Sequence, residues 1–560
     1  MSALDAGADE PVFESAAQLP GAGRVPPEAA TAPASARELK GLIRDWRRGR
    51  ATKKLGEAFS DGYVVVIGAL MIGAMVINVI LKAQRVVAQC TAASCLSART
   101  ILPWAALAGA VAVALAASRL FGPVLASAAE GFWLLDTPVS RAKLLGARLV
   151  AAVVVAFVGG AAIGALISAL TGSGLAEVLI WAAATGLSGA GAVAFAAAQQ
   201  GIDRHLLTRA ATYVFGVLGI AALMIVVAVA ARWTSLGLGL DVGGQLGVVM
   251  IGFSGLVLIA SIVLARIRLG RIRRTRLLSG GALVSGISGA FYALDIGLAR
   301  DIVVERRAME IGHVKPHRGK GLGVEAIMWR EWQRLRRFPQ PLFVVGGTIV
   351  VPYAADALGM STLTTVFSAL ALFAATIPLL GGLRVLTRTG GLARCLPFSL
   401  AQIKLASITV PAVVEAVWTL AVTPAFVGLG DSTTHRDLTT ALLMALATGA
   451  AGLLGAVRWT QAKGVDFGAP MISTQAGALP PGLMTNLFRG FDVCLLSTFP
   501  MLLGGSPFWS LAIAAIAALI LLNSWDAESV RARQAEQQKL LEASRKQRDA
   551  AKTAAQQRKR

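Results

Sequence analysis

Charged side chains are scarce in this sequence, and most of its long apolar segments lack them altogether. Asp, Glu, Lys and Arg make up 15% of the 560 residues, whereas hydrophobic residues make up 55%. Runs of about 18 or more apolar residues recur, and each is long enough to cross a bilayer core of about 30 Å. A water-soluble protein cannot bury so many helices that are apolar on every side. The composition therefore predicts an all-α polytopic membrane protein.

Cysteine and histidine are also rare, with four residues of each. Four Cys are too few for a disulfide framework. Cys90 and Cys95 share one loop that we expect to face outward, where a local bridge and two free thiols both fit the spacing. The histidines are scattered over different loops and predict no metal site. No nucleophile–base pair is recognisable, so we expect neither catalytic residues nor a cofactor in this chain.

Nucleotide-binding motifs are missing as well. The string "GKGLG" at 319–323 lacks the upstream Gly spacing and the Ser/Thr of a P-loop. The string "LSGGA" at 278–282 matches part of the ABC ATPase signature, but no P-loop accompanies it. The "DFG" at 466–468 has no kinase glycine-rich loop or catalytic-loop motif beside it. We interpret all three matches as coincidental and expect the chain not to be an enzyme.

Acidic residues are outnumbered, 31 against 53 Lys and Arg, which gives a formal charge of +22. The basic residues concentrate in certain connecting loops and at both ends, as the positive-inside rule requires. We attribute the charge to topology and to attraction for anionic lipids rather than to nucleic acid. No cleaved signal peptide is expected, because the first sixty residues are polar. An even number of spans would place both termini in the cytoplasm of a bacterial cell, with the chain in its inner (plasma) membrane.

Apolar runs predict about twelve spans. They lie at about 63–81, 101–120, 149–170, 176–198, 210–231, 246–265, 341–358, 362–383, 405–428, 438–457, 487–504 and 507–523. A basic segment precedes the first and another precedes the seventh. In the second of these, Val324, Ile327, Met328, Trp332 and Leu335 form one helical stripe opposite Arg330, Arg334 and Arg337. The stripe at Leu39, Leu42, Ile43 and Trp46 favours a helix in the headgroup layer, with a solvated basic helix as the alternative.

A Pro-x-Ser loop occurs twice, in "LLDTPVSRAKLLGARL" at 134–149 and in "ARCLPFSLAQIKLASI" at 393–408. Pro138 aligns with Pro397, and Ser140 with Ser399. Each copy follows an amphipathic helix and two predicted spans, and four more spans follow it. The pattern predicts two tandem six-helix modules in parallel orientation. The predicted parts are a disordered leader (1–36), a first module (37–265), a basic cytoplasmic linker (266–323), a second module (324–523) and a charged tail (524–560).

Each Pro-x-Ser loop is a candidate docking site for a cytoplasmic partner. We expect the Pro to begin a short, partly apolar helix at the inner face of the membrane. An ordinary connector whose Trp anchors it at the interface is the alternative. The repetition at the same topological place favours docking.

This arrangement resembles the permease half of ABC-2-type exporters. "FWLLDTPVSRAKLL" is similar to a short string of such permeases, and "VDFGAPMISTQAGALPPGL" at 465–483 resembles a stretch of fused twelve-span actinobacterial members. The resemblance implies an exporter of a small molecule, lipid or peptide. It also implies a separate ABC ATPase in two copies, which supplies ATP hydrolysis through coupling loops. The residues assigned to these loops are Glu130, Phe132, Trp133, Leu135, Pro138, Ser140, Arg141, Arg394, Leu396, Pro397 and Ser399. The second loop has no counterpart of Asp136 and Arg141, so we expect unequal contacts.

Glu415 is the clearest ionisable residue inside a predicted span. A charge at mid-bilayer costs several kcal/mol. One hypothesis is that Glu415 lines a translocation path or pairs across the seam between the modules; the other is a carboxyl held by a hydrogen bond inside the bundle. The alternatives to an ABC exporter are a secondary active transporter, which would need more such residues, and a non-transport polytopic scaffold.

Overall fold

The computed structural model describes residues 93–133, 140–202, 206–230, 240–292, 295–313, 318–358, 360–428, 435–462 and 488–522, together with 472–474, 477–479 and scattered single residues. Four predicted segments lie wholly or mostly outside these residues: the leader at 1–36, the basic amphipathic helix that follows it, the span at 63–81, and the tail at 524–560.

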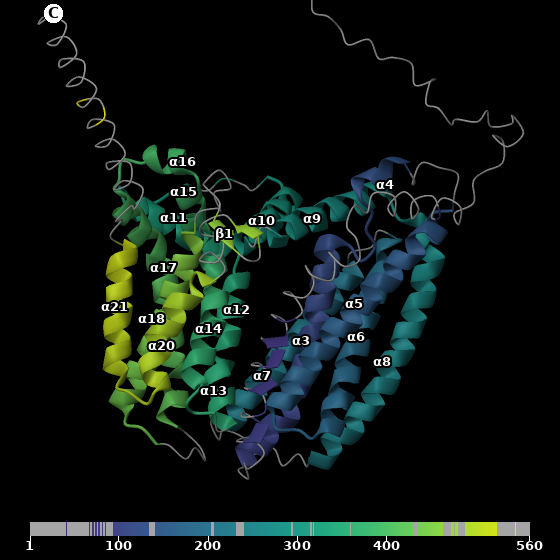
Figure 1. Ribbon diagram of the computed structural model, residues 1–560, viewed down its shortest axis with the longest axis horizontal. Coiled ribbons are helices and arrows are strands. Elements are labelled where there is room, and N and C mark those ends of the chain that lie inside the picture. Colours follow the sequence, from purple (N-terminus) through teal and green to yellow (C-terminus); the bar gives the residue numbers. More distant parts are fainter. Residues whose placement is uncertain are drawn as a thin grey trace, which may run out of the picture.

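Long helices dominate the described residues, and they pack into two groups (Figure 1). The first helix group consists of α3 (Ala93–Phe121), α5 (Arg141–Leu170), α6 (Leu175–Gln200), α7 (Leu206–Ala230) and α8 (Leu240–Arg268). The second helix group consists of α12 (Gln340–Thr348), α13 (Val350–Ala357), α14 (Thr364–Thr376), α17 (Leu400–Val427), α18 (Leu438–Thr460), α20 (Phe491–Leu502) and α21 (Pro507–Leu522).

Among the described residues, eight helices are long and apolar enough to cross a membrane. A ninth candidate joins α11 (Glu325–Arg337) to α12–α13 with a bend of 84°, and α20 and α21 are shorter apolar helices. Apolar side chains on the outer faces, such as Val155, Leu256 and Leu420, are largely exposed, as lipid contact requires. The chain is thus a multi-pass helical membrane protein, while the total of twelve spans stays a prediction.

Glycines let α5 and α6 approach closely. Gly160 and Gly164 of α5 are buried against the backbone of α6. A Cβ atom added at Gly160 would lie 2.8 Å from the carbonyl oxygen of Thr185, and one added at Gly186 would lie 2.9 Å from that of Phe157. Because lipid tails are as apolar as the helices, such close van der Waals packing is a main source of helix association in membranes.

The two groups contact each other through α7 and α3 on one side and α13 and α17 on the other. Ile101 and Val226 pack on Leu358, and Val227 packs with Tyr353 and Ala425. Figure 1 shows this contact at the end of the groups that lies away from α9 (Arg274–Tyr292) and α10 (Ile296–Ile311). The opposite end is called the linker end below. It also carries α4 (Ala128–Trp133), α15 (Gly381–Arg388) and α16 (Gly390–Arg394).

The predicted basic linker at 266–323 is largely helical and bridges the two groups at the linker end (Figure 1). It contains α9 (Arg274–Tyr292) and α10 (Ile296–Ile311). Gly280 and Gly281 of α9 lie against the backbone carbonyls of Phe121 and Ala126, with which any side chain would collide. These two glycines belong to "LSGGA", so the ATPase-like string has a packing role here.

One small β-hairpin departs from the all-helical prediction. Strand β1 (Ile472–Thr474) pairs antiparallel with β2 (Gly477–Leu479), with Ser473 opposite Ala478. It lies in the connection between α18 and α20, at the string that resembles fused twelve-span permeases.

Adjacent glycines on α5 allow a matched test of helix approach. Gly160→Ala is expected to lower the free energy of unfolding by about 1–3 kcal/mol, because the new methyl group meets the α6 backbone. Gly159→Ala meets nothing within 4 Å and is expected to be neutral or to stabilise α5 by up to about 1 kcal/mol. Thermal unfolding in detergent, followed by circular dichroism, measures both; equal effects would contradict this packing.

Candidate functional site

The connection between α3 and α5, which is called the first Pro-x-Ser segment below, contains a short helix before the Pro-x-Ser loop. This helix, α4 (Ala128–Trp133), is held by contacts at its first turn and along its side. Ser127 and Glu130 exchange hydrogen bonds between side chain and backbone, at 3.3 and 3.0 Å, which is a capping box. Glu130 also pairs with Arg148 of α5, which donates to the carbonyl of Leu125 at 2.9 Å. The predicted site residue Glu130 therefore holds α4 against α5.

The surface of α4 combines close packing with an exposed aromatic group. Gly131 lies against Leu278 of α9, where a side chain would collide. Phe132 is 68% exposed, and the guanidinium of Arg274 lies 5.2 Å from its ring centroid. Trp133 ends α4, but its side chain is not described. Leu135 and Pro138 lie outside the described residues.

The connection between η3 (Ile377–Leu380) and α17, which is called the second Pro-x-Ser segment below, contains α15 (Gly381–Arg388) and α16 (Gly390–Arg394), followed by bends at 396–398. The expectation that the Pro begins a short helix is wrong for Pro397. It lies in an exposed bend after α16, and the next helix begins at Leu400, after the N-cap Ser399. Ser399 forms a capping box with Gln402, so this cap sets the helix start rather than the Pro. Leu396 is half-buried, and the side chain of Arg394 is not described.

The two aligned serines occupy the same local position. Ser140 is the exposed N-cap of α5, and Ser399 is the exposed N-cap of α17; both have extended backbone conformations. Only Ser399 makes a side-chain cap bond. Arg141 is the first residue of α5 and is half-buried. The segments share their N-cap geometry, but α4 and α16 lie at the linker end over different helix groups (Figure 1).

The amphipathic helix α11 packs its predicted apolar stripe on the second segment. Ile327 is buried in one cluster with Leu386, Ile403 and Ala406, and Val324, Met328, Leu396 and Phe398 pack against this cluster. Trp332 is 45% exposed on the same helix. Because the stripe contacts protein, α11 is attached to the segment that we expect to dock a partner.

Buried charges reinforce the attachment of α11 at the linker end. Glu331 of α11 is 2% exposed, and its Oε2 lies 2.9 Å from Arg334. Glu331 lies against Gly382, where any side chain would collide with the carboxylate. Arg334 also donates to the carbonyl of Leu379 in the 3₁₀ turn η3 (Ile377–Leu380), which contains Pro378.

A second ion pair, in which only the arginine is buried, ties the linker to α15. Arg384 is 2% exposed and donates to both carboxylate oxygens of Asp301 of α10, at 2.6 and 2.9 Å. Its guanidinium also lies 5.0 Å from the ring centroid of Trp459. Arg388 approaches Asp301 at 3.5 Å and Asp295 at 3.4 Å. Parallel Arg–carboxylate bonds of this kind define geometry as well as energy.

Sequence reasoning missed the buried Glu331 and the pairing of Asp301 with Arg384, although one signal was present. Glu331 stands four residues after Ile327 and four before Leu335, which places it on the buried stripe of α11. An acidic residue on the buried face of a helix indicates that a cation lies nearby and that a small residue faces it on the neighbouring helix. The pairing of Asp301 with Arg384 spans 83 residues and has no local signature.

Glu415 lies inside the second helix group. It is 4% exposed, and Thr376 Oγ1 donates to its Oε1 at 2.8 Å. Because Thr376 is in α14 and Glu415 in α17, the bond stays within one group and does not cross to α3 or α7. This geometry matches the alternative of a carboxyl held inside the bundle.

The candidate disulfide is not described: Cys90 and the side chain of Cys95 lie outside the described residues. Free thiols are found at Cys395, which is exposed, and at Cys494, which is buried. No group of three or more His, Cys, Asp or Glu that could hold a metal occurs among the residues that the structure describes.

Two arginines one turn apart on α15 allow a matched stability test. Arg384→Gln is expected to lower the free energy of unfolding by about 2 kcal/mol or more, because it removes the buried partner of Asp301. Arg388→Gln removes a more exposed pair, and its effect is expected to stay within about 1 kcal/mol. Chemical denaturation in detergent measures both, and a larger loss for Arg388→Gln would refute the assignment.

Substitutions at Glu415 separate its hydrogen bond from its charge. Glu415→Gln keeps an acceptor for Thr376 and is expected to retain the thermal midpoint. Glu415→Ala leaves a cavity and a buried hydroxyl without this acceptor, and is expected to cost about 2–4 kcal/mol. Thermal unfolding in detergent is the measurement. A Gln variant as unstable as the Ala variant would show that the carboxyl itself is needed.

Comparison with known proteins places the chain in one family. A model of DUF6297, described as a family of unknown function, matches residues 95–470. No curated protein and no solved structure matches. The matched region begins in α3, ends after α18 and contains both Pro-x-Ser segments, the linker and α11. Because the match covers more than half of the chain, the protein belongs to the DUF6297 family.

Proposed function

We propose that the chain is the membrane-embedded permease of an ABC-2-like exporter, built from two tandem six-helix modules and driven by a separate ATPase. The observation that carries the proposal is the pair of short helices α4 and α16 (Figure 1). Both lie at the linker end, both precede an N-cap serine, and each connects one membrane helix to the next.

Helix contacts support the two-module arrangement. If α3, α5, α6, α7 and α8 correspond in order to α14, α17, α18, α20 and α21, most equivalent pairs pack together in the two groups. The exceptions are α3–α5 and α20–α21, whose counterparts make little contact. In the first group α6 contacts α3, α5, α7 and α8, and α3 contacts α7. In the second group α18 contacts α14, α17, α20 and α21, and α14 contacts α20. A shared packing pattern of this kind is typical of internally repeated transporters.

A separate ATPase can drive this permease only if it binds two conformations of the permease with different affinity. In this proposal ATPase subunits bind at α4 and α16 on the cytoplasmic side and pull on α5 and α17, the helices that begin just after them. Glu130–Arg148 holds α4 against α5, and the cluster around Ile403 holds α11 on the second segment. These contacts transmit force from the docking surface to the spans.

A secondary active transporter is the second candidate, and Glu415 is the observation that favours it. Such a carrier couples transport to an ion and needs ionisable residues inside its spans. A non-transport scaffold would also be polytopic and helical, but it would not need paired docking helices. Both alternatives predict a protein that functions without an ATPase.

Co-purification tests the proposed partner. Tagged wild-type protein, extracted from its native membrane in mild detergent, is expected to bring down an ABC ATPase that is identified by mass spectrometry. Phe132→Ala/Trp133→Ala is expected to lose at least about nine tenths of this ATPase, because Phe132 is largely exposed and aromatic side chains dominate such interfaces.

Phe508→Ala/Trp509→Ala is the matched control, since this Phe-Trp pair begins α21 at the opposite end, and Phe508 is 70% exposed against 68% for Phe132. The control variant is expected to retain the ATPase at the wild-type level. Absence of any ATPase from the wild-type preparation, or equal loss in the two variants, would contradict the proposal.

A further inference from the structure

A cavity of about 760 Å³ lies at the linker end of the second helix group. Its walls come from α10, from α11 and the start of α12, and from η3 and α15. Its volume falls in the range of small-molecule binding sites, about 300–1,000 Å³. The bend between α11 and α12 lies at its edge, with Phe338 and Gln340 on the wall.

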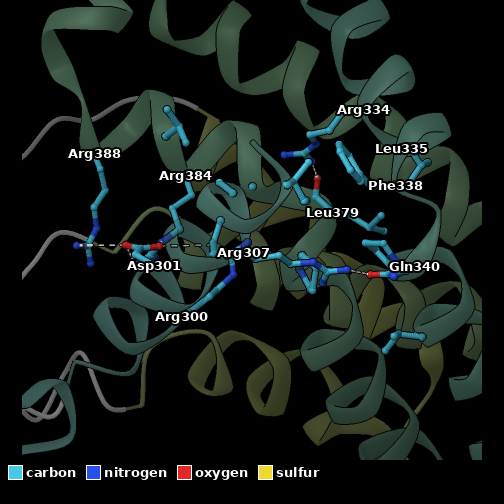
Figure 2. A pocket seen from close by; sticks show the side chains of 18 of the residues that line it. Arg300, Asp301, Arg307, Arg334, Leu335, Phe338, Gln340, Leu379, Arg384 and Arg388 are labelled. Atoms are coloured by element: carbon cyan, nitrogen blue, oxygen red, sulfur yellow. Dashed lines mark hydrogen bonds and ion pairs between the residues drawn. The ribbon is translucent and has the colours of Figure 1, made fainter. Parts of the chain in front are cut away.

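Five arginines line this cavity, together with a single carboxylate (Figure 2). The arginines are Arg300, Arg307, Arg334, Arg384 and Arg388, and the acid is Asp301. Two further carboxylates pair with these arginines: Glu331 with Arg334, and Asp295 with Arg388. With all three acids included, the arginines still outnumber the carboxylates.

The arginines are incompletely compensated by protein groups. Burial and the guanidinium of Arg384 lower the pKa of Arg300 from its ordinary value to about 10, although Asp301 opposes this shift. Arg384 Nη1 is buried and has no hydrogen-bond partner in the described part of the chain. Arg307 bonds only to the neutral amide of Gln340 among the pairs described. An anion in the cavity would relieve this excess of positive charge.

The rest of the wall is apolar. Val304 and Ile311 of α10, Phe338 at the bend, Val344 of α12 and Val385 of α15 line it and remain substantially exposed. Val344 lies on the helix that continues into the membrane-spanning part of the second group. A ligand that matches both halves of the wall carries a compact anion and an apolar chain.

We propose that this cavity binds an anionic phospholipid, with the phosphate among Arg300, Arg307 and Arg334 and an acyl chain along Val304, Phe338 and Val344. Phosphate accepts several charge-assisted hydrogen bonds from guanidinium groups. The cavity also lies where α12 leaves the bend, at the ends of the spans. Phospholipid headgroups reside at that depth, and basic pockets between membrane helices bind them.

A free phosphate ion would satisfy the arginines but would leave the apolar wall in contact with water. The apolar half of the cavity therefore distinguishes a lipid from a soluble anion. The site does not depend on the proposed ATPase, so its test stands apart from co-purification.

Native mass spectrometry of the full chain in detergent tests the proposal by titration with defined lipids. The wild-type protein is expected to bind phosphatidylglycerol about tenfold or more tightly than zwitterionic phosphatidylcholine. Arg300→Gln/Arg307→Gln is expected to weaken phosphatidylglycerol binding about tenfold or more, because two charge-assisted hydrogen bonds are lost. Ala308→Phe fills part of the cavity from an exposed position of α10 and is expected to weaken binding similarly without changing any charge.

Arg266→Gln/Arg271→Gln is the matched control, because it removes two exposed arginines at the linker end but outside the cavity. The control is expected to bind as the wild type does, and inorganic phosphate at equal concentration is expected not to displace the lipid. Equal binding by the cavity variants and the control overturns the proposal. Displacement by inorganic phosphate, or unchanged binding by Ala308→Phe, overturns the assignment to a lipid. Ala308→Phe retains every cavity charge, so it provides the test if the double arginine variant does not fold.

Discussion

A carboxylate that is buried away from water destabilises the fold unless a cation pairs with it and the surrounding space fits it. Glu331 is such a carboxylate at the linker end. Arg334 supplies the cation from the same helix, and Gly382 supplies the space. Arg334 also reaches the carbonyl of Leu379, in the turn where Pro378 interrupts the helix. Through these contacts α11 is held across the end of the second helix group, at 84° to the helix that follows it. The arginine-lined cavity and the second Pro-x-Ser segment both depend on that position.

Within the spans a different constraint operates, because a bilayer offers the backbone no hydrogen-bond partners and gives helices no hydrophobic reason to associate. Small residues meet this constraint by permitting close contact, as Gly160 does against α6 and Gly449 does against Thr419. The same device occurs outside the spans, where Gly280 and Gly281 bring α9 onto the backbone after α3. The linker is therefore a packed element that joins the two helix groups rather than a loose connection.

Periodicity and hydropathy predicted the parts of this fold that depend on residues close together in the sequence. The expected spans at 149–170, 176–198 and 438–457 each coincide with a long helix. The spacing also predicted the apolar stripe of α11, but Ile327 and Leu335 are buried against other helices, whereas an interfacial helix presents such a stripe to the membrane. The pairing of Asp301 with Arg384 could not be predicted from the sequence, because partners that are 83 residues apart produce no periodic pattern. Pro397 shows another limit: the capping box of Ser399 decides where α17 begins, and the Pro only precedes it. The close packing of Gly280 and Gly281 in the string "LSGGA" could not be predicted from sequence either, because it depends on three-dimensional contacts.

The central claim is that α4 and α16 both face the cytoplasm, where an ATPase can bind them. Labelling with a membrane-impermeant maleimide tests it directly in a Cys90→Ser/Cys95→Ser background. One protein retains Cys395, the exposed thiol beside α16. A second carries Cys395→Ser and Ser140→Cys at the exposed N-cap of α5. The account predicts that both thiols react in inside-out vesicles and remain unlabelled in intact cells. Reaction of either thiol from the outer surface alone would contradict it.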